Sequence, residues 1–294
     1  MSRKFSPPPD RHPRKPRIVL PPGACDCHFH VFGPQALFPL HPDRKIDVED
    51  ATYEQFLHMQ EMLGFERGLL VASALHFYGY DQLIHLLCRD PERLRGVAIL
   101  QSGVTDKELD LLGNAGVVGA RFYPDLDPNL DERLLDRIHE RGWSAHFLIR
   151  GEERAKAWRA PILASQGPIV VEHAGWQPPS AGLDGDGFRI VLEMLDTGRC
   201  WVKLSPRMSD QPTLPFSDCL PFIQELIRRA PDRMLWGSDW PHPNYFNPMP
   251  NDADLIDMLL DWAPEESVRH RILVDNPADL FGFPAIPSST RRSA

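Results

Sequence analysis

The sequence lacks long apolar runs and has few cysteines. No segment reaches the roughly 18 uninterrupted apolar residues of a membrane-spanning helix, and charges and prolines stand where a signal peptide needs an apolar run. The five cysteines are odd in number and lack the paired spacing of a zinc knuckle, which argues against a disulfide framework. For Cys25 and Cys27, packing in a buried strand is favoured over metal binding. We therefore expect a soluble, cytoplasmic protein.

Two glycine-rich patterns of nucleotide-binding folds, G-x-G-x-x-G and the phosphate loop, are also absent. With 41 acidic and 32 basic residues the formal net charge is −9, and such a field repels phosphate and anionic lipid. We expect neither nucleic acid nor a membrane as a partner. A small anionic substrate must then be attracted by a local cationic pocket.

The two ends of the chain differ in composition from the part between them. Residues 1–22 contain six basic side chains among many prolines, which predicts an extended segment lying on the surface. Residues 286–294 form a second polar tail, predicted to be flexible. A non-catalytic protein that binds a ligand or nucleic acid through the basic tail is the alternative from another functional class. Oligomeric state stays open, with a homo-oligomer as one alternative.

Eight short apolar runs recur between the tails, and most are followed by a stretch with helical periodicity. The predicted strands are Ala24–Val31, Arg67–Ser73, Leu94–Leu100, Val117–Tyr123, Ser144–Ile149, Pro168–His173, Cys200–Ser205 and Met234–Asp239. The predicted helices are Thr52–Gly64, Gly79–Asp90, Asp106–Ala115, Leu130–Arg141, Glu152–Ser165, Phe188–Thr197, Leu220–Ala230, Asp252–Leu260 and Glu265–Val274. Alternating strands and helices imply parallel pairing. Eight such units predict an α/β fold, a single-domain TIM (β/α)₈ barrel over residues 23–285.

Four chemically active side chains fall at the ends of three predicted strands. His28 and His30 end the first strand, His173 ends the sixth and Asp239 ends the eighth. Residues two apart in a strand share a face, and the carboxyl ends of the strands form the mouth of such a barrel. A carboxylate at the end of an apolar strand is costly to bury unless it is paired, protonated or bound to metal. We therefore expect these four residues to form one catalytic site.

Three motifs that carry these residues resemble the amidohydrolase superfamily (amidohydrolase 2): Cys-Asp-Cys-His-Phe-His-Val-Phe-Gly-Pro, Glu-His-Ala-Gly and Gly-Ser-Asp-Trp-Pro-His-Pro-Asn. Within it, the chain is most similar to the lactonase branch, which includes 2-pyrone-4,6-dicarboxylate hydrolase, sulfomuconolactone hydrolase and sugar lactonases. The resemblance implies a barrel enzyme that hydrolyses a lactone or related ester from aromatic or sugar-acid breakdown. Asp239 would take a proton from the attacking water, and the histidines would stabilise charge on the carbonyl oxygen.

Metal use is left open by the resemblance. Many members bind one or two divalent metals, with a modified lysine on strand four, whereas this chain has Arg121 near that place. Two metals are therefore disfavoured. One zinc ion held by His28, His30, His173 and Asp239 would have three nitrogen ligands and one oxygen ligand, while the pyrone dicarboxylate hydrolases work without metal. The expectation is no cofactor or one divalent metal.

Candidate substrate-binding residues follow several of the strands: Arg121, Arg207, Arg150, Ser73, His76 and His242. The resemblance implies that Arg121 and Arg207 contact carboxylate, and a guanidinium offers a carboxylate two parallel donors. Ser73 and His76 could add hydrogen bonds, and His242 could orient water or touch substrate.

The chain departs from the pyrone hydrolases around this predicted pocket. Ile46 and Leu148 stand where tyrosines are expected, and Tyr123, Pro124 and Asp125 replace basic residues. We expect a carboxylated lactone of pyrone-like or muconolactone-like chemistry, with altered selectivity. The alternative within enzymes is a metal-dependent decarboxylase of an aromatic or muconate acid.

Overall fold

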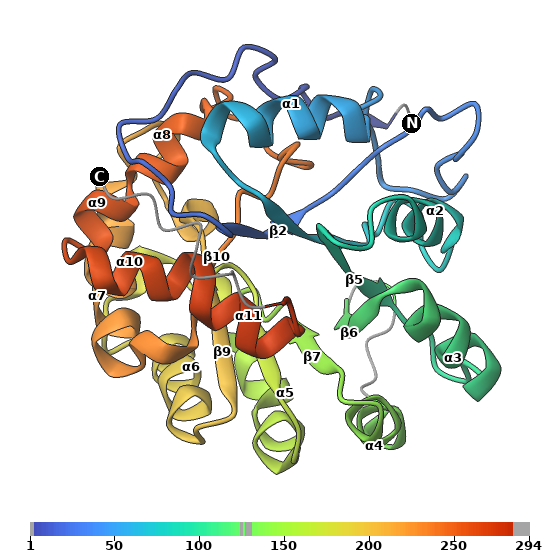
Figure 1. Cartoon of the computed structure of the whole chain (residues 1–294). Coiled ribbons are helices and arrows are strands. Elements are labelled where there is room, and N and C mark those ends of the chain that lie inside the picture. The colour runs from blue at the N-terminus through green and yellow to red at the C-terminus, as the bar shows by residue number, and fades with distance from the viewer. Residues whose placement is uncertain (1–2, 124–125, 127–130, 285–294) are drawn as a thin grey trace.

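A computed structural model describes residues 3–123, 126 and 131–284 and shows a barrel of parallel strands surrounded by helices (Figure 1). Neighbouring strands in the sheet follow the chain in order. They are β2 (Cys25–Phe29), β4 (Arg67–Val71), β5 (Leu94–Ile99), β6 (Val117–Phe122), β7 (Ser144–Phe147), β8 (Ile169–Val171), β9 (Cys200–Leu204) and β10 (Met234–Trp236). All eight predicted strands are confirmed, and each is shorter than predicted.

The ring is completed between β2 and the segment that follows β10. Phe29 forms a parallel bridge with Trp240. The backbone N–H of His30 donates to the carbonyl of Trp240 at 2.7 Å, and that of Asp239 donates to the carbonyl of His28 at 2.8 Å. The predicted TIM barrel is confirmed, and the bonds that close it are made by the residues next to the predicted site.

Helices cover the outside of the barrel (Figure 1). They are α1 (Tyr53–Leu63), α2 (Asp81–Arg89), α3 (Asp106–Ala115), α4 (Glu132–Glu140), α5 (Glu152–Ala164), α6 (Asp186–Asp196), α7 (Leu220–Arg229), α8 (Asp252–Asp257), α9 (Leu259–Trp262), α10 (Glu266–His270) and α11 (Asn276–Phe281). Local sequence explains their ends: α1 begins at the capping box of Thr52 and Gln55, and Gly64 ends it with a φ of 95°.

The last part of the chain differs most from prediction. Instead of one helix over Asp252–Leu260, α8 and α9 follow each other, and the predicted helix Glu265–Val274 continues through a π-helical turn into α11. The start of the predicted helix at Leu130 lies outside the described residues. None of the helices in the described part of the chain is both long and apolar enough to cross a membrane.

Two apolar cores lie on the two sides of the sheet. The larger one packs between the strands and the outer helices. The smaller one fills the barrel with inward-facing residues such as Cys25, Cys27 and Val97, and Phe281 and Phe283 from the end of the chain pack against them. The packing interpretation of the two cysteines is therefore confirmed.

A bulge in β2 decides which of its side chains face the interior. The pairing register with β4 shifts between Asp26 and Phe29. Cys27 belongs to the inner core, yet Phe29 points outward and stacks on Phe56 of α1, with ring centroids 3.6 Å apart. A regular strand would place both on one face. Because of the bulge, His28 and His30 reach the interior instead.

The described part of the N-terminal segment lies along the surface of the barrel (Figure 1). It adds a small parallel sheet that the sequence did not predict, between β1 (Lys4–Phe5) and β3 (Ile46–Asp47). Three of its arginines form ion pairs with the barrel: Arg11 with Glu49, Arg14 with Asp254 and Arg17 with Asp257. The domain limits at residues 22 and 285 stay predictions, and the tail 286–294 lies outside the described residues.

Candidate active site

The four predicted catalytic residues lie together at the mouth of the barrel. His28 belongs to β2 and His30 follows it, whereas His173 and Asp239 lie beyond the ends of β8 and β10. The backbone of His173 has a φ of 52° and that of Asp239 a φ of 64°. Such left-handed values are uncommon outside glycine, and they end the strand ladders earlier than predicted.

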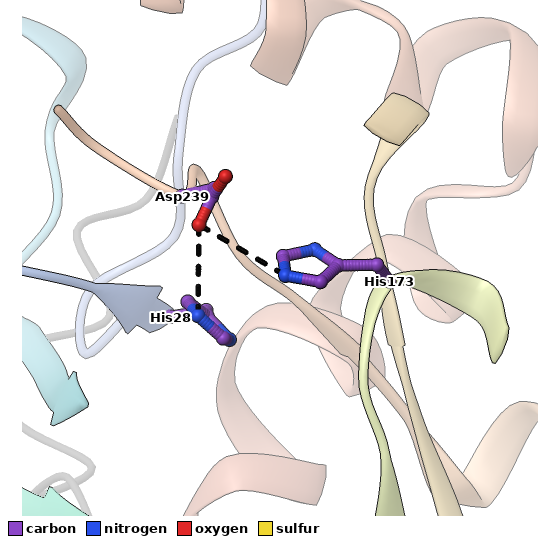
Figure 2. A group of neighbouring side chains, drawn as sticks. All are labelled: His28, His173 and Asp239. Carbon is purple, nitrogen blue, oxygen red and sulfur yellow. Dashed lines mark ion pairs between the residues drawn. The ribbon is translucent and has the colours of Figure 1, made fainter. Parts of the chain in front are cut away.

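Asp239 is the residue on which the three imidazoles converge. Its Oδ1 lies 3.4 Å from His30 Nε2, 3.6 Å from His28 Nε2 and 3.9 Å from His173 Nε2. Figure 2 shows His28 and His173 directed at this carboxylate from two sides. All four side chains are buried, none more than 4% exposed. The predicted meeting of these distant residues is therefore present in the structure.

Two of the imidazoles are fixed through their second ring nitrogen. His30 Nδ1 lies 2.7 Å from the carbonyl oxygen of Val71. A carbonyl can only accept, so this nitrogen carries the hydrogen and Nε2 of the neutral ring has the lone pair. His173 Nδ1 contacts Ser205 Oγ at 2.9 Å.

Burial keeps His28 and His173 neutral, while neighbouring groups keep Asp239 ionised. Burial lowers the pKa of His173 to about 4 and that of His28 well below its ordinary value. For Asp239, burial raises the pKa, but the Arg207 guanidinium and the nearby imidazoles outweigh burial and hold that pKa well below its usual range. Arg207 Nε lies 2.9 Å from Asp239 Oδ2. Arg207, predicted to bind substrate, is thus also the ion-pair partner of the predicted base.

A cavity of about 400 Å³ opens above Asp239. His30, His173 and Asp239 line it, as do four of the predicted substrate-binding residues: Ser73, Arg121, Arg150 and Arg207. Lys45 and Arg154, which the sequence analysis did not single out, add two further cations to its wall. Ile46 and Leu148 also line it, so the aliphatic replacements identified in the sequence face this cavity.

Three predicted residues lie outside this cavity lining. His28 lies beneath it, against His30 and Lys203. His76 stacks near Phe32, with centroids 6.0 Å apart, and borders a separate surface hollow. His242 Nε2 lies 3.1 Å from Asp252 Oδ1. Contacts of His76 and His242 with substrate stay predictions.

A buried charge network below the cavity was missed from the sequence. Glu172 Oε2 accepts from Arg121 Nε at 2.9 Å, and Arg121 Nη2 is 2.8 Å from the same oxygen. Glu172 Oε1 lies 3.9 Å from Lys203 Nζ. The signal was present, because Lys203 interrupts the apolar strand Cys-Trp-Val-Lys-Leu and a buried ammonium needs a partner.

The predicted zinc site consists of four residues, and the structure gives the positions of their ligand atoms. His28, His173 and Asp239 offer atoms within 4.8 Å of one another, a group that does not include His30. However, His28 Nδ1 lies 3.2 Å from the ammonium of Lys203. An ammonium can only donate, so a hydrogen bond between these two atoms would place the hydrogen of neutral His28 on Nε2, the atom that faces Asp239. This arrangement does not fit a metal ion at His28.

Comparison with known proteins agrees with the fold and with the expected family. Residues 25–283 match the family model described as amidohydrolase. The 4-sulfomuconolactone hydrolase of Rhizobium radiobacter is 36% identical over 90% of this chain and 92% of its own length. The 2-pyrone-4,6-dicarboxylate hydrolase of Comamonas testosteroni is 32% identical over 92% and 93%.

A solved structure shows the same architecture. The putative 2-pyrone-4,6-dicarboxylic acid hydrolase of Pseudomonas putida is 27% identical, superimposes with a TM-score of 0.75, and the match covers 91% of this chain and all of that one. The present chain is likewise a hydrolase that acts on ester bonds. With the family model matching nearly all of the barrel, the chain belongs to the amidohydrolase family.

Proposed function

We propose that this enzyme opens a lactone that carries at least one anionic substituent. The observation that supports this most directly is the cavity itself. Asp239, His30 and His173 line it together with five cations: Lys45, Arg121, Arg150, Arg154 and Arg207. In a protein with a net charge of −9, such a cationic wall concentrates an anionic ligand at the site. The names of two relatives, which denote a sulfonated and a dicarboxylated lactone, agree with this class.

Asp239 would act as the general base of the reaction. It takes a proton from a water molecule as the water oxygen bonds to the lactone carbonyl carbon. The ring C–O bond then breaks, and the same proton goes to the departing oxygen. The product is an open-chain acid that ionises, so each turnover releases one proton to neutral solution.

Charge that develops on the carbonyl oxygen needs nearby hydrogen-bond donors or positive groups. His173 and Arg207 are the candidates, because both line the cavity and both lie within 4 Å of Asp239. His30 is less suited to donate, since the hydrogen of the neutral ring is held by the Val71 carbonyl. No step of this reaction requires a metal ion.

The arginines differ in how freely they can meet a substrate carboxylate. Arg121 is already engaged, because its Nε donates to Glu172 and its Nη2 forms an ion pair with the same carboxylate. Arg207 is paired with Asp239. Arg150 is exposed, and in the described part of the structure its guanidinium forms no ion pair; it lies over the Trp176 ring, 4.7 Å from its centroid. We therefore assign the first contact with the substrate anion to Arg150.

A panel of lactones tests the proposed function. 2-Pyrone-4,6-dicarboxylate, sulfonated and carboxylated muconolactones and neutral sugar lactones would be compared, with and without chelator, by following acid release. Turnover of an anionic lactone at least 10-fold faster than of any neutral one is expected. Release of carbon dioxide would identify the decarboxylase alternative, and turnover of neutral lactones only would refute the proposed substrate class.

The variant Arg150→Met tests the assignment of the substrate contact. It should raise KM for an anionic lactone roughly 10-fold, the effect of the ~1.5 kcal/mol that a hydrogen bond to a charged group contributes at its lower limit. The kcat should change little, because the guanidinium of Arg150 lies over Trp176 and is not assigned a part in the proton transfer. Steady-state rates on anionic and neutral lactones measure both constants.

Arg189→Met is the matched control, since it removes an exposed arginine from α6, on the outside of the barrel. An equal rise in KM for neutral lactones would remove Arg150 from the recognition role. Arg121→Met is a poorer test, because it would leave Glu172 buried without its closest partner.

A further inference from the structure

Lys203 is a fully buried cation that the proposed reaction does not use. It belongs to β9, is 1% exposed and does not line the cavity. Its Nζ lies 3.2 Å from His28 Nδ1 and 3.9 Å from Glu172 Oε1. The Glu172 carboxylate that faces Lys203 favours its ammonium form. A charge kept at this depth needs a structural or functional reason.

The contacts of His28 and His30 form one continuous chain. Lys203 Nζ meets His28 Nδ1 at 3.2 Å, His28 Nε2 meets His30 Nε2 at 3.3 Å, and His30 Nδ1 meets the Val71 carbonyl at 2.7 Å. The ammonium at one end can only donate, and the carbonyl at the other can only accept. Both ends therefore impose the same direction on the bonds between them.

We propose that Lys203 is a positioning residue that sets the tautomer of His28, so that the two imidazoles form a directed hydrogen-bond chain instead of a pair of metal ligands. Lys203 donates to His28 Nδ1, His28 Nε2–H donates to His30 Nε2, and His30 Nδ1–H donates to Val71. Each ring nitrogen then has one partner, and neither Nε2 keeps a free lone pair.

The same chain orients the predicted base. His28 Nε2–H lies 3.6 Å from Asp239 Oδ1 and His30 Nε2 lies 3.4 Å from it. A fixed His28 tautomer keeps an N–H near two acceptors, the lone pair of His30 Nε2 and the Asp239 carboxylate, so a donor lies close to both of them. His28 would thus act through Asp239 and His30, in agreement with its place beneath the cavity.

Nitrogen NMR of the natural chain tests the tautomers directly. In protein labelled with ¹⁵N-histidine, His28 and His30 are assigned by the signals lost in His28→Gln and His30→Gln. We expect a hydrogen on Nε2 of His28 and on Nδ1 of His30 at neutral pH. A hydrogen on Nδ1 of His28 would overturn the proposal, whatever the variants show.

Zinc binding to chelator-treated protein gives the second test. Lys203→Met should bind zinc at least 10-fold more tightly than the natural chain, because His28 can then move its hydrogen to Nδ1 and offer Nε2. The variant should fold, since Glu172 keeps Arg121 as its partner. Lys156→Met, at an exposed lysine, is the control and should bind zinc as the natural chain does.

Zinc affinity would be measured by calorimetric titration, in which two results would contradict the proposal. One is equal zinc affinity of the natural chain and a folded Lys203→Met variant. The other is a gain in affinity that persists in Lys203→Met with His28→Gln. The inference builds on the proposed hydrolytic site, but neither test uses a lactone, so its failure is separate from failure of the substrate assignment.

Discussion

Replacing Asp239 by asparagine is expected to lower kcat by about 10²- to 10⁴-fold, the range that a positioned general base contributes. Asparagine keeps the shape of the side chain and an oxygen that can lie beside Arg207. It cannot take a proton from water at neutral pH. Initial rates of acid release on the best anionic lactone measure the loss, and urea unfolding measures stability.

The control for this variant is Asp196→Asn, which removes a carboxylate from an exposed ion pair with Arg229. It should retain the natural rate. If folded Asp239→Asn also kept a rate within a few-fold of the natural enzyme, Asp239 would not be the base and the proposed mechanism would fail. A variant that is inactive because it is unfolded would be recognised by the urea measurement.

Glu172→Gln should destabilise the fold by roughly 3–5 kcal/mol, the cost of removing one partner of a buried ion pair. Burial raises the pKa of Glu172, but Arg121 and Lys203 outweigh burial and keep it ionised. Without this charge, Arg121 and Lys203 remain at 5% and 1% exposure, with no other ion-pair partner among the described residues. Urea unfolding at neutral pH gives the free energy of unfolding.

Glu193→Gln is the matched control, because Glu193 pairs with Arg159 at the surface. Exposed pairs contribute at most about 1 kcal/mol. Adding Lys203→Met to Glu172→Gln should recover part of the lost stability, since one of the two unpaired cations is removed. A loss for Glu172→Gln no larger than that of the control would show that the network does not depend on this charge.

Periodicity was sufficient to predict the architecture from the sequence. Each strand of the barrel is a short apolar run between polar breaks, and the intervening helices carry one apolar face, as α7 does with Phe222, Ile223 and Leu226. The end of the chain was harder. A π-helical turn at Arg271–Asp275 joins α10 to α11, and packing, not local preference, decides where such a turn occurs.

Residue type and position in the sequence were sufficient to predict which residues meet at the candidate site, but not which ion pairs they form. Arg121 illustrates the limit. Its place at the end of β6 predicted a residue facing the mouth, which the structure shows. Its partner Glu172 lies 51 positions later in the sequence, so no local pattern could indicate that the guanidinium is already engaged. The pairing of Arg207 with Asp239 escaped prediction for the same reason.

Because of the bulge in β2, the side chains of this strand that face the interior depend on the number of residues in the strand. On either side of the bulge the inward positions have opposite parity, odd-numbered at Cys25 and Cys27 and even-numbered at His28 and His30. Inserting one residue between Cys27 and His28 would shift this parity by one position and turn both imidazoles toward α1. This stretch should therefore tolerate conservative exchanges of its cysteines, while a one-residue insertion would abolish the chemistry without altering any residue of the site.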